Sequence, residues 1–301
     1  MAKVEGTLRV VLAALAGNAA VAATKFVTFA FTGSTAMLTE AIHSLVDTGD
    51  QMLLLVGRNR ARRPPDETHP FGYGLETYFW SFIVALMIFF AGGAVSIWEG
   101  VDKLLHPAPT RLAWVSVAVI AASALFEGLS LRTAWREYRR VVRGRDVRVW
   151  AFLKISKDPN LFATLLEDGA ALTGLALAAL GVIGAGFLGI DWADGAASVG
   201  IGLLLVAVAM FMANETRSLI AGEAAAAPIV EQVRNTALGC GDLGELRTLR
   251  TLHLGPSAIL VALGWTFPAE WDRVRLAQGE AELVRRIRGA DPRIADVLFE
   301  P

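Results

Sequence analysis

The chain has 301 residues, of which 54% are hydrophobic and only 19% are charged, and its mean hydropathy is +0.48. Soluble domains carry closer to a quarter charged residues, so this composition favours a membrane protein. The net charge of −1 gives no basic surface for nucleic acid, and the single cysteine, Cys240, excludes a disulfide framework or a cysteine-rich zinc module.

Six apolar segments are long enough to cross a bilayer, which takes about 20 mostly apolar residues as a helix. They cover residues 8–31, 35–57, 77–99, 112–135, 160–188 and 193–216. The first segment is long and is followed at once by the second, so we expect it to stay as a span and not to be cleaved as a signal peptide. Residues 1–222 are therefore predicted to form an all-α bundle of six transmembrane helices in a lipid bilayer.

The charges of the loops predict the orientation of this bundle. On one side lie two arginine-rich loops, while the turns on the other side hold little or no Lys or Arg. The positive-inside rule places the basic loops, and with them both termini, in the cytoplasm. The basic residues are Arg58, Arg60, Arg62 and Arg63 after the second segment, and Arg136, Arg139, Arg140, Arg143, Arg145, Arg148, Lys154 and Lys157 after the fourth.

Residues 223–301 have a different composition and read as a separate small domain. A short helix is followed by two strands joined by a Gly-Pro turn, an amphipathic helix and a last strand. This α-β-β-α-β order predicts a cytoplasmic α+β domain. Because so few residues bury little core, pairing with a second copy would help this domain, and we expect a homodimer.

The second apolar segment carries ionisable residues at helical spacing. His43, Asp47 and Asp50 fall within about 60° of one another on a helix, so they share a face. Each such group at mid-membrane costs about 2.5–3.5 kcal/mol, which favours a functional role over a structural hydrogen-bonded pair. Imidazole with carboxylates suits zinc, iron, cobalt or manganese. These residues are therefore candidate metal ligands.

The fifth apolar segment supplies Glu167 and Asp168 as candidate partners. Neighbours on a helix point about 100° apart, so both cannot face one site equally well. His43, Asp47 and Asp168 make three ligands, and Asp50, Glu167 or water would complete a tetrahedron. Two further intramembrane charges, Lys25 and Glu127, are expected to pair with each other because an unpaired charge would be costly.

The stretch from "TGSTAMLTEAIHSLVDTGD" through "HPFGYG", together with "LLED" in the fifth segment, resembles the cation diffusion facilitator family, and more narrowly its zinc-transporter-9-like branch. The resemblance covers the whole chain and implies a ferredoxin-like fold for the C-terminal domain. It also implies a membrane transporter, not an enzyme, that exports Zn²⁺ from the cytoplasm as a homodimer with protons as the counter-ion. We expect it in the inner membrane of a bacterium.

The resemblance also implies a metal site between the second and fifth spans. His43 and Asp47 match one ligand pair and Asp168 half of the other, but Thr164 stands where relatives have His or Asp. Asp50 or Glu167 would have to compensate, and Asp50 is preferred because it shares the face of His43 and Asp47, whereas Glu167 points about 60° to one side of Thr164. A second metal site of some relatives is matched here by Asp66 and His69, but Tyr73 replaces its second histidine.

Other interpretations remain open at this stage. In the C-terminal domain His253 is the one histidine, with Asp242 or Glu300 as companions, and we interpret it as a strand residue and not as a regulatory zinc ligand. An oxygen-rich site would favour Mn²⁺ or Fe²⁺, with Cd²⁺ and Co²⁺ also conceivable cargoes. The replacement at Thr164 makes a non-transporting membrane scaffold or sensor a further alternative.

Overall fold

The computed structural model describes residues 18–107, 112–142, 157 and 159–300. Their backbone divides into two compact units. The helical unit takes in the described residues within 1–56, 80–148 and 160–214, and the α/β unit those within 57–79, 149–159 and 215–301. The loop after α2, together with residues 157 and 159 before the start of α7, therefore groups with the C-terminal residues. A domain boundary at residue 222 stays a prediction.

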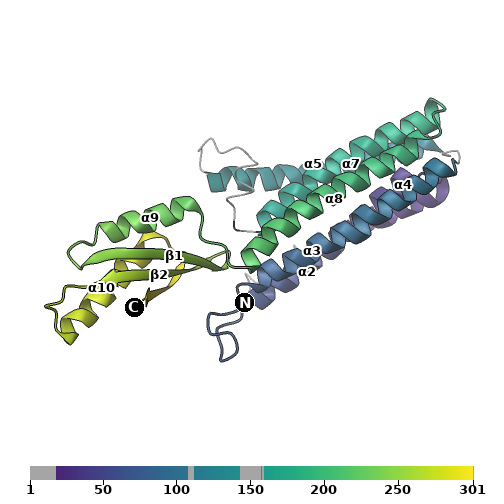
Figure 1. Ribbon diagram of the computed structural model, residues 1–301. Helices are drawn as coiled ribbons and strands as arrows, with labels where there is room; N and C mark the ends of the chain where they lie inside the picture. Colours follow the sequence, from purple (N-terminus) through teal and green to yellow (C-terminus); the bar gives the residue numbers. More distant parts are fainter. Residues whose placement is uncertain (1–17, 108–111, 143–156, 158, 301) are drawn as a thin grey trace, which may run out of the picture. The chain divides into compact units, whose positions relative to one another are not determined.

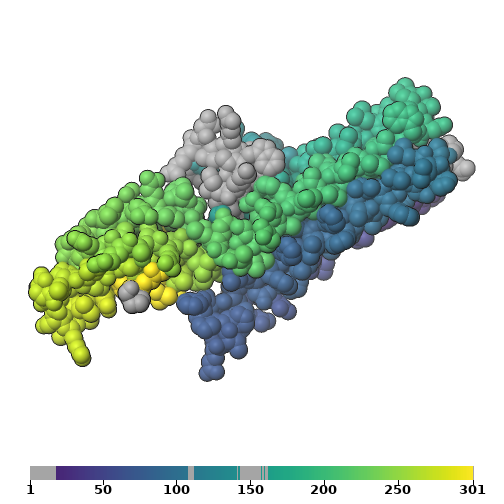
Figure 2. All heavy atoms as spheres, in the orientation of Figure 1, coloured from purple at the N-terminus to yellow at the C-terminus, as the bar shows by residue number. Residues whose placement is uncertain are grey.

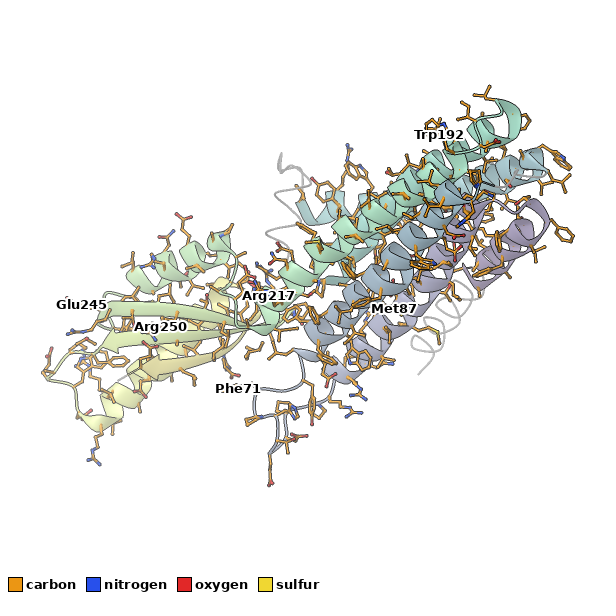
Figure 3. All side chains as sticks on the ribbon, turned by 45° about the vertical axis from the view of Figure 1, so that its right-hand side comes forward. Phe71, Met87, Trp192, Arg217, Glu245 and Arg250 are labelled. Atoms are coloured by element: carbon orange, nitrogen blue, oxygen red, sulfur yellow. The ribbon has the colours of Figure 1, made fainter. Side chains whose placement is uncertain are left out.

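Long helices dominate the helical unit (Figure 1). Where the sequence predicts the third span, a π-helical segment of seven residues, η1, lies between two α-helices. Figure 3 marks the start and end of the last long helix by Trp192 and Arg217. The helices are residues 18–32, α2 (Thr35–Ala61), α3 (Glu76–Met87), η1 (Ile88–Ala94), α4 (Val95–Leu105), α5 (Ala113–Val142), α7 (Pro159–Phe187) and α8 (Ala193–Ile220).

Four of the described helices are long and apolar enough to cross a membrane: Glu76–Leu105, Ala113–Arg140, Phe162–Phe187 and Ala193–Ile220. These correspond to the third, fourth, fifth and sixth predicted spans. Helix α2 is also long, but its apolar sequence is interrupted by buried ionisable side chains, among them Glu40, His43 and Asp50. The helical residues 18–32 begin at the edge of the described part of the chain. The described part of the chain thus includes a membrane-type helical unit with four apolar spans.

Glycines bring the third predicted span into close contact with α8. Gly93 and Gly100 face Gly202 and Gly195, so the two helices run antiparallel along this seam, which Figure 2 shows as adjoining bands on one face. A Cβ on Gly100 would lie 2.7 Å from the backbone nitrogen of Val199 and 2.8 Å from the carbonyl oxygen of Gly195. Small residues permit this approach, which replaces hydrophobic burial as the source of helix packing in lipid.

The turn between residues 18–32 and α2 is fastened to α8 by one buried carboxylate. Asp194 accepts hydrogen bonds from the Ser34 hydroxyl at 2.6 Å and from the backbone N–H of Thr35 at 2.7 Å. The hydroxyl of Thr35 donates a third bond, at 3.0 Å. Asp194 is fully buried and so serves, from another helix, as the cap that the first turn of α2 needs.

Replacing Asp194 by alanine should destabilise the protein by about 2 kcal/mol, because buried donors at the start of α2 would lose their acceptor. Thermal unfolding in detergent measures this effect. Asp191→Ala is the matched control, since Asp191 is an exposed carboxylate three residues earlier. Equal melting temperatures for the two variants would contradict the capping role.

The α/β unit contains α9 (Ala227–Leu238), β1 (Glu245–Gly255), β2 (Ala258–Thr266), α10 (Arg273–Ala290) and β3 (Ile294–Glu300). The observed order of elements is the predicted α-β-β-α-β. The sheet order is β1-β2-β3, with β1 and β2 antiparallel and β2 and β3 parallel. The three strands and two helices agree with the predicted α+β class, while the ferredoxin-like assignment remains an inference from the resemblance.

One face of this sheet carries the core of the α/β unit. Alternate residues of β2, Ile259, Val261 and Leu263, are fully buried, as expected for one face of a strand. They pack with Val233 of α9 and Leu283 of α10. Both helices therefore cover the same face of the sheet.

Candidate metal site in the helical unit

The two candidate ligands on α2 lie side by side. His43 Nδ1 and Asp47 Oδ1 are 3.5 Å apart, as their spacing of four residues on one helix requires. The His43 side chain is 3% exposed, and neither of its ring nitrogens has a hydrogen-bond partner. Asp47 Oδ1 likewise has none. Buried polar groups are usually satisfied, so this imidazole and carboxylate are available to a ligand.

Asp50 and Glu167 also have unsatisfied oxygens. Asp50 is fully buried, and both of its carboxylate oxygens lack a hydrogen-bond partner. Oε1 of Glu167, on α7, lacks one as well. A buried carboxylate needs a proton, a cation or hydrogen bonds to be tolerated. Gly49 sits between these α2 residues, and the Met87 side chain, labelled in Figure 3, packs against it from α3.

A cavity of about 550 Å³ opens beside these residues within the helical unit. Its walls come from residues 18–32, α2, α5 and α7. Four carboxylates line it: Asp47, Glu127, Glu167 and Asp168. Asp50 and His43 are not among the lining residues, although His43 contacts Asp47. Candidate residues of the second and fifth predicted spans thus meet at one cavity.

The partner of Asp168 comes from α5. The Ser130 hydroxyl donates a hydrogen bond of 2.9 Å to Asp168 Oδ2, so one of the oxygens is held by the protein. Thr164 lies one turn before Asp168 on α7 and is half-buried. Within the described part of the chain, no three His, Cys, Asp or Glu side chains are gathered closely enough to hold a metal ion. The ligand set remains a prediction.

The expected pairing of Lys25 with Glu127 is wrong. Lys25 Nζ instead donates to Glu40 Oε2 at 3.0 Å and to Ser44 Oγ at 2.8 Å, both on α2. The turn at Gly33 folds residues 18–32 back along α2, which brings Glu40 within reach. Neither Glu40 nor Ser44 stood out in the sequence, although Glu40 lies three residues before His43 and therefore close to its face of α2.

The residues of the predicted second metal site, Asp66 and His69, lie in the α/β unit. The carboxylate of Asp66 accepts hydrogen bonds from the Tyr73 hydroxyl at 2.6 Å, from the Thr68 hydroxyl at 2.7 Å and from the backbone N–H of His69 at 2.8 Å. These bonds hold the pKa of Asp66 well below its usual range. Gly72, with φ of +81°, completes the turn. The loop is therefore built around Asp66 as an acceptor.

His253 is 1% exposed on β1, and its Nδ1 lies 3.2 Å from the carbonyl oxygen of Gly255. The companions considered for it have other partners. Asp242 binds Arg286 through two bonds of 2.9 and 3.0 Å, and Glu300 accepts from Thr248 at 2.9 Å. Burial lowers the pKa of His253, and the charge of Lys157 acts in the same direction.

A consequence for pH follows from His253. Its folded-state pKa lies below the unfolded value of about 6.5, so the unfolded chain binds more protons in that range and stability falls as the pH drops below about 6.5. We expect the melting temperature to fall less between pH 7.5 and 5.5 in His253→Asn than in the unchanged protein. An identical fall in both would contradict this assignment.

The chain is also similar in sequence to known proteins. Residues 11–221 match the cation efflux transmembrane domain. The chain is 35% identical to the human mitochondrial proton-coupled zinc antiporter SLC30A9 over 208 residues, which are 69% of this chain and 37% of that protein. It is 33% identical to metal tolerance protein C4 of Arabidopsis thaliana over 216 residues, 72% of this chain and 47% of that one. It is 26% identical to the cation-efflux pump FieF of Klebsiella pneumoniae (strain 342) over 287 residues, 94% and 90% of the two chains.

The chain therefore belongs to the cation diffusion facilitator family and resembles its zinc-transporter-9-like branch. The relatives are cation transporters and antiporters, not enzymes. The chain spans less than half the length of the human and Arabidopsis relatives.

Proposed function

We propose that this protein exports a divalent transition metal from the cytoplasm in exchange for protons, and that zinc is the first candidate for this metal. The observation that carries the proposal is the cavity: Asp47 of α2 and Glu167 and Asp168 of α7 line it, and the unpartnered imidazole of His43 lies beside Asp47. Ionisable groups within a membrane bundle mark an ion pathway by default. The names of the human zinc antiporter and of the cation-efflux pump support the same reading.

The proposed ligands also explain the coupling to protons. Metal binds deprotonated carboxylates and neutral imidazole, so loading the site releases protons and reprotonation weakens binding. With four carboxylates at one cavity, a proton arriving from the far side of the membrane can displace the cation. Rocking of the helices around the cavity would then expose the site alternately to the two sides of the membrane.

We further propose six spans, cytoplasmic termini and a homodimer, in a bacterial inner membrane. The last turns of α2, α5 and α8 carry arginines. Exposed tryptophans lie toward the opposite ends of the helices: Trp98 in the first turn of α4, seven residues before its end, Trp114 at the start of α5 and Trp192 just before α8. Basic residues on one side and aromatic residues at the membrane interface support this orientation.

Flux into proteoliposomes with an imposed pH gradient tests the function. We expect zinc uptake that depends on the gradient and raises the pH of the lumen in step with metal movement, because protons leave as the metal enters. Manganese, iron, cobalt and cadmium are compared under the same conditions, because an oxygen-rich cavity would favour manganese or iron. Absence of flux for every metal, in protein that inserts and unfolds cooperatively, would overturn transport and leave a scaffold or sensor.

We propose Glu167 in place of Asp50 as the additional ligand beside His43, Asp47 and Asp168, and the support is that Glu167 lines the cavity whereas Asp50 does not. Glu167→Gln should raise the apparent Km for zinc by about tenfold, the equivalent of about 1.4 kcal/mol of binding. Asp50→Asn is the matched comparison, because it also removes a carboxylate without hydrogen-bond partners, but one that is fully buried. This variant should raise the Km less than Glu167→Gln does. The reverse order of effects would assign the additional ligand to Asp50.

A further inference from the structure

Lys25 places an ammonium group in the interior of the helical unit. The side chains of Lys25 and Glu40 are 1% and 0% exposed, and their charged atoms are 3.0 Å apart. A second bond, of 2.8 Å, joins Lys25 to the Ser44 hydroxyl. An ion pair so completely removed from water is weak evidence for a stabilising role, because apolar residues of similar size often serve as well. Its presence therefore calls for another explanation.

The pair lies beside the candidate metal site. Glu40, Ser44 and Asp47 recur at spacings of four and three residues, so they share one face of α2. Ser44 and Asp47 both line the cavity, and His43, next to Ser44 in the chain, contacts Asp47. The Lys25 ammonium thus binds the turn of α2 that immediately precedes Asp47.

Glu40 has one oxygen in the ion pair and one that is free. Oε1 of Glu40 is buried without a hydrogen-bond partner. It lies 2.8 Å from the position that a Cβ on Gly174 of α7 would occupy, so the carboxylate oxygen packs closely against α7 at this glycine. Gly174 is less than two turns beyond Asp168 on α7. Glu40 therefore reaches from one proposed ligand helix to the other.

We infer that Lys25 is a positioning residue of the transport site, which holds Glu40 in an ion pair and so keeps that carboxylate from becoming an additional ligand of the cation. This inference rests on the proposed function. Four carboxylates already line the cavity. If the Glu40 carboxylate, about one helical turn before His43, joined them as a fifth, the site would bind a dication more tightly. A carrier must release its cargo, so binding has to stay weak enough for exit. The fixed ammonium also repels the dication directly.

Zinc binding to the full-length protein in detergent, by isothermal titration calorimetry, tests this inference together with flux in proteoliposomes. In Lys25→Gln, Glu40 is freed and the repelling charge is gone, so the zinc Kd should fall by about tenfold. Maximal flux should fall as well, because release is slower. In Lys25→Gln/Glu40→Gln the Kd should return to within about threefold of the unchanged protein, since both charges are absent.

A pair that merely ties two helices together predicts a different pattern. Lys25→Gln would then lower the melting temperature and leave the zinc Kd unchanged, and that result would overturn the inference. Lys103→Gln is the matched control, because Lys103 is also a buried lysine of the helical unit, but its ammonium binds the carbonyl oxygen of Gly33 and no carboxylate. It should lose stability without any gain in zinc affinity.

A second pair of variants keeps the test decisive if Lys25→Gln does not fold. Glu40→Gln leaves the ammonium without its counter-charge and should raise the zinc Kd several-fold, whereas Lys25→Met/Glu40→Met should leave it unchanged. Unaltered affinity in Glu40→Gln would overturn the inference. Asp47→Asn separates this outcome from the fate of the proposed function: zinc binding and flux that survive in that variant reject the site itself, whatever Lys25 does.

Discussion

Zinc flux should fall at least about a hundredfold when Asp47 is replaced by asparagine, and equally when His43 is replaced by alanine. Each change removes a ligand of the proposed site while leaving the apolar faces of α2 intact. Losing a ligand to a desolvated dication costs several kcal/mol, and each 1.4 kcal/mol is a factor of ten. Flux in proteoliposomes at matched protein density, with melting temperature in detergent as the check on folding, measures this result.

Thr48→Ala serves as the control for these two variants. Thr48 follows Asp47 in the chain, but its hydroxyl is bonded to the carbonyl oxygen of Ser44 on its own helix at 2.9 Å. It should transport at close to the normal rate. Normal flux in both Asp47→Asn and His43→Ala would remove the candidate site, whatever the remaining carboxylates of the cavity do.

The second large effect is expected at the glycine seam. Gly100→Ala should destabilise the protein by about 3 kcal/mol, because the new methyl group would overlap backbone atoms of α8, which cannot move aside as a side chain can. The third predicted span and α8 would have to separate along their length. The free energy of unfolding in detergent, and the yield of folded protein, would both report the change.

Gly128→Ala provides the opposite expectation for the same substitution. Gly128 lies on α5 with open space where its Cβ would be, so alanine should be neutral or stabilise the helix by up to about 1 kcal/mol. A loss of stability as large as that of Gly100→Ala would show that the seam has no special role.

The parts of the fold that the sequence predicts well depend on local signals. Hydropathy marks the four apolar spans, and the alternation and turn residues after Gly222 predict the order of elements in the α/β unit. The helices extend further than predicted: α5 continues to Val142, beyond the apolar residues, because arginine is itself a good helix former and nothing interrupts the backbone there.

In the candidate site, too, the features that depend on local spacing could be predicted and those that depend on helix packing could not. Spacing alone places His43 and Asp47 on one face, and they lie 3.5 Å apart. The partner of Lys25 could not be predicted this way, since several acids were available and the choice depends on how residues 18–32 turn against α2. Nor does any local pattern reveal that Ser130 bonds Asp168, because that contact depends on the rotation of α5 relative to α7.

The π-helical segment η1 explains how the third predicted span keeps one side toward the bundle. From Ile88 onward its buried residues include Ile88, Gly92, Ser96 and Gly100, a series of steps of four, together with Gly93 and Lys103. On a regular α-helix each such step overshoots a full turn by about 40°, so three steps would carry the series about 120° around the axis. The hydrogen bonds of a π-helix, five residues apart, widen the turn and take up part of this angular drift. A helical wheel drawn through residues 76–105 at constant pitch would therefore assign lipid-facing positions beyond Ile88 incorrectly, and mutagenesis of this span should be planned in two separate frames.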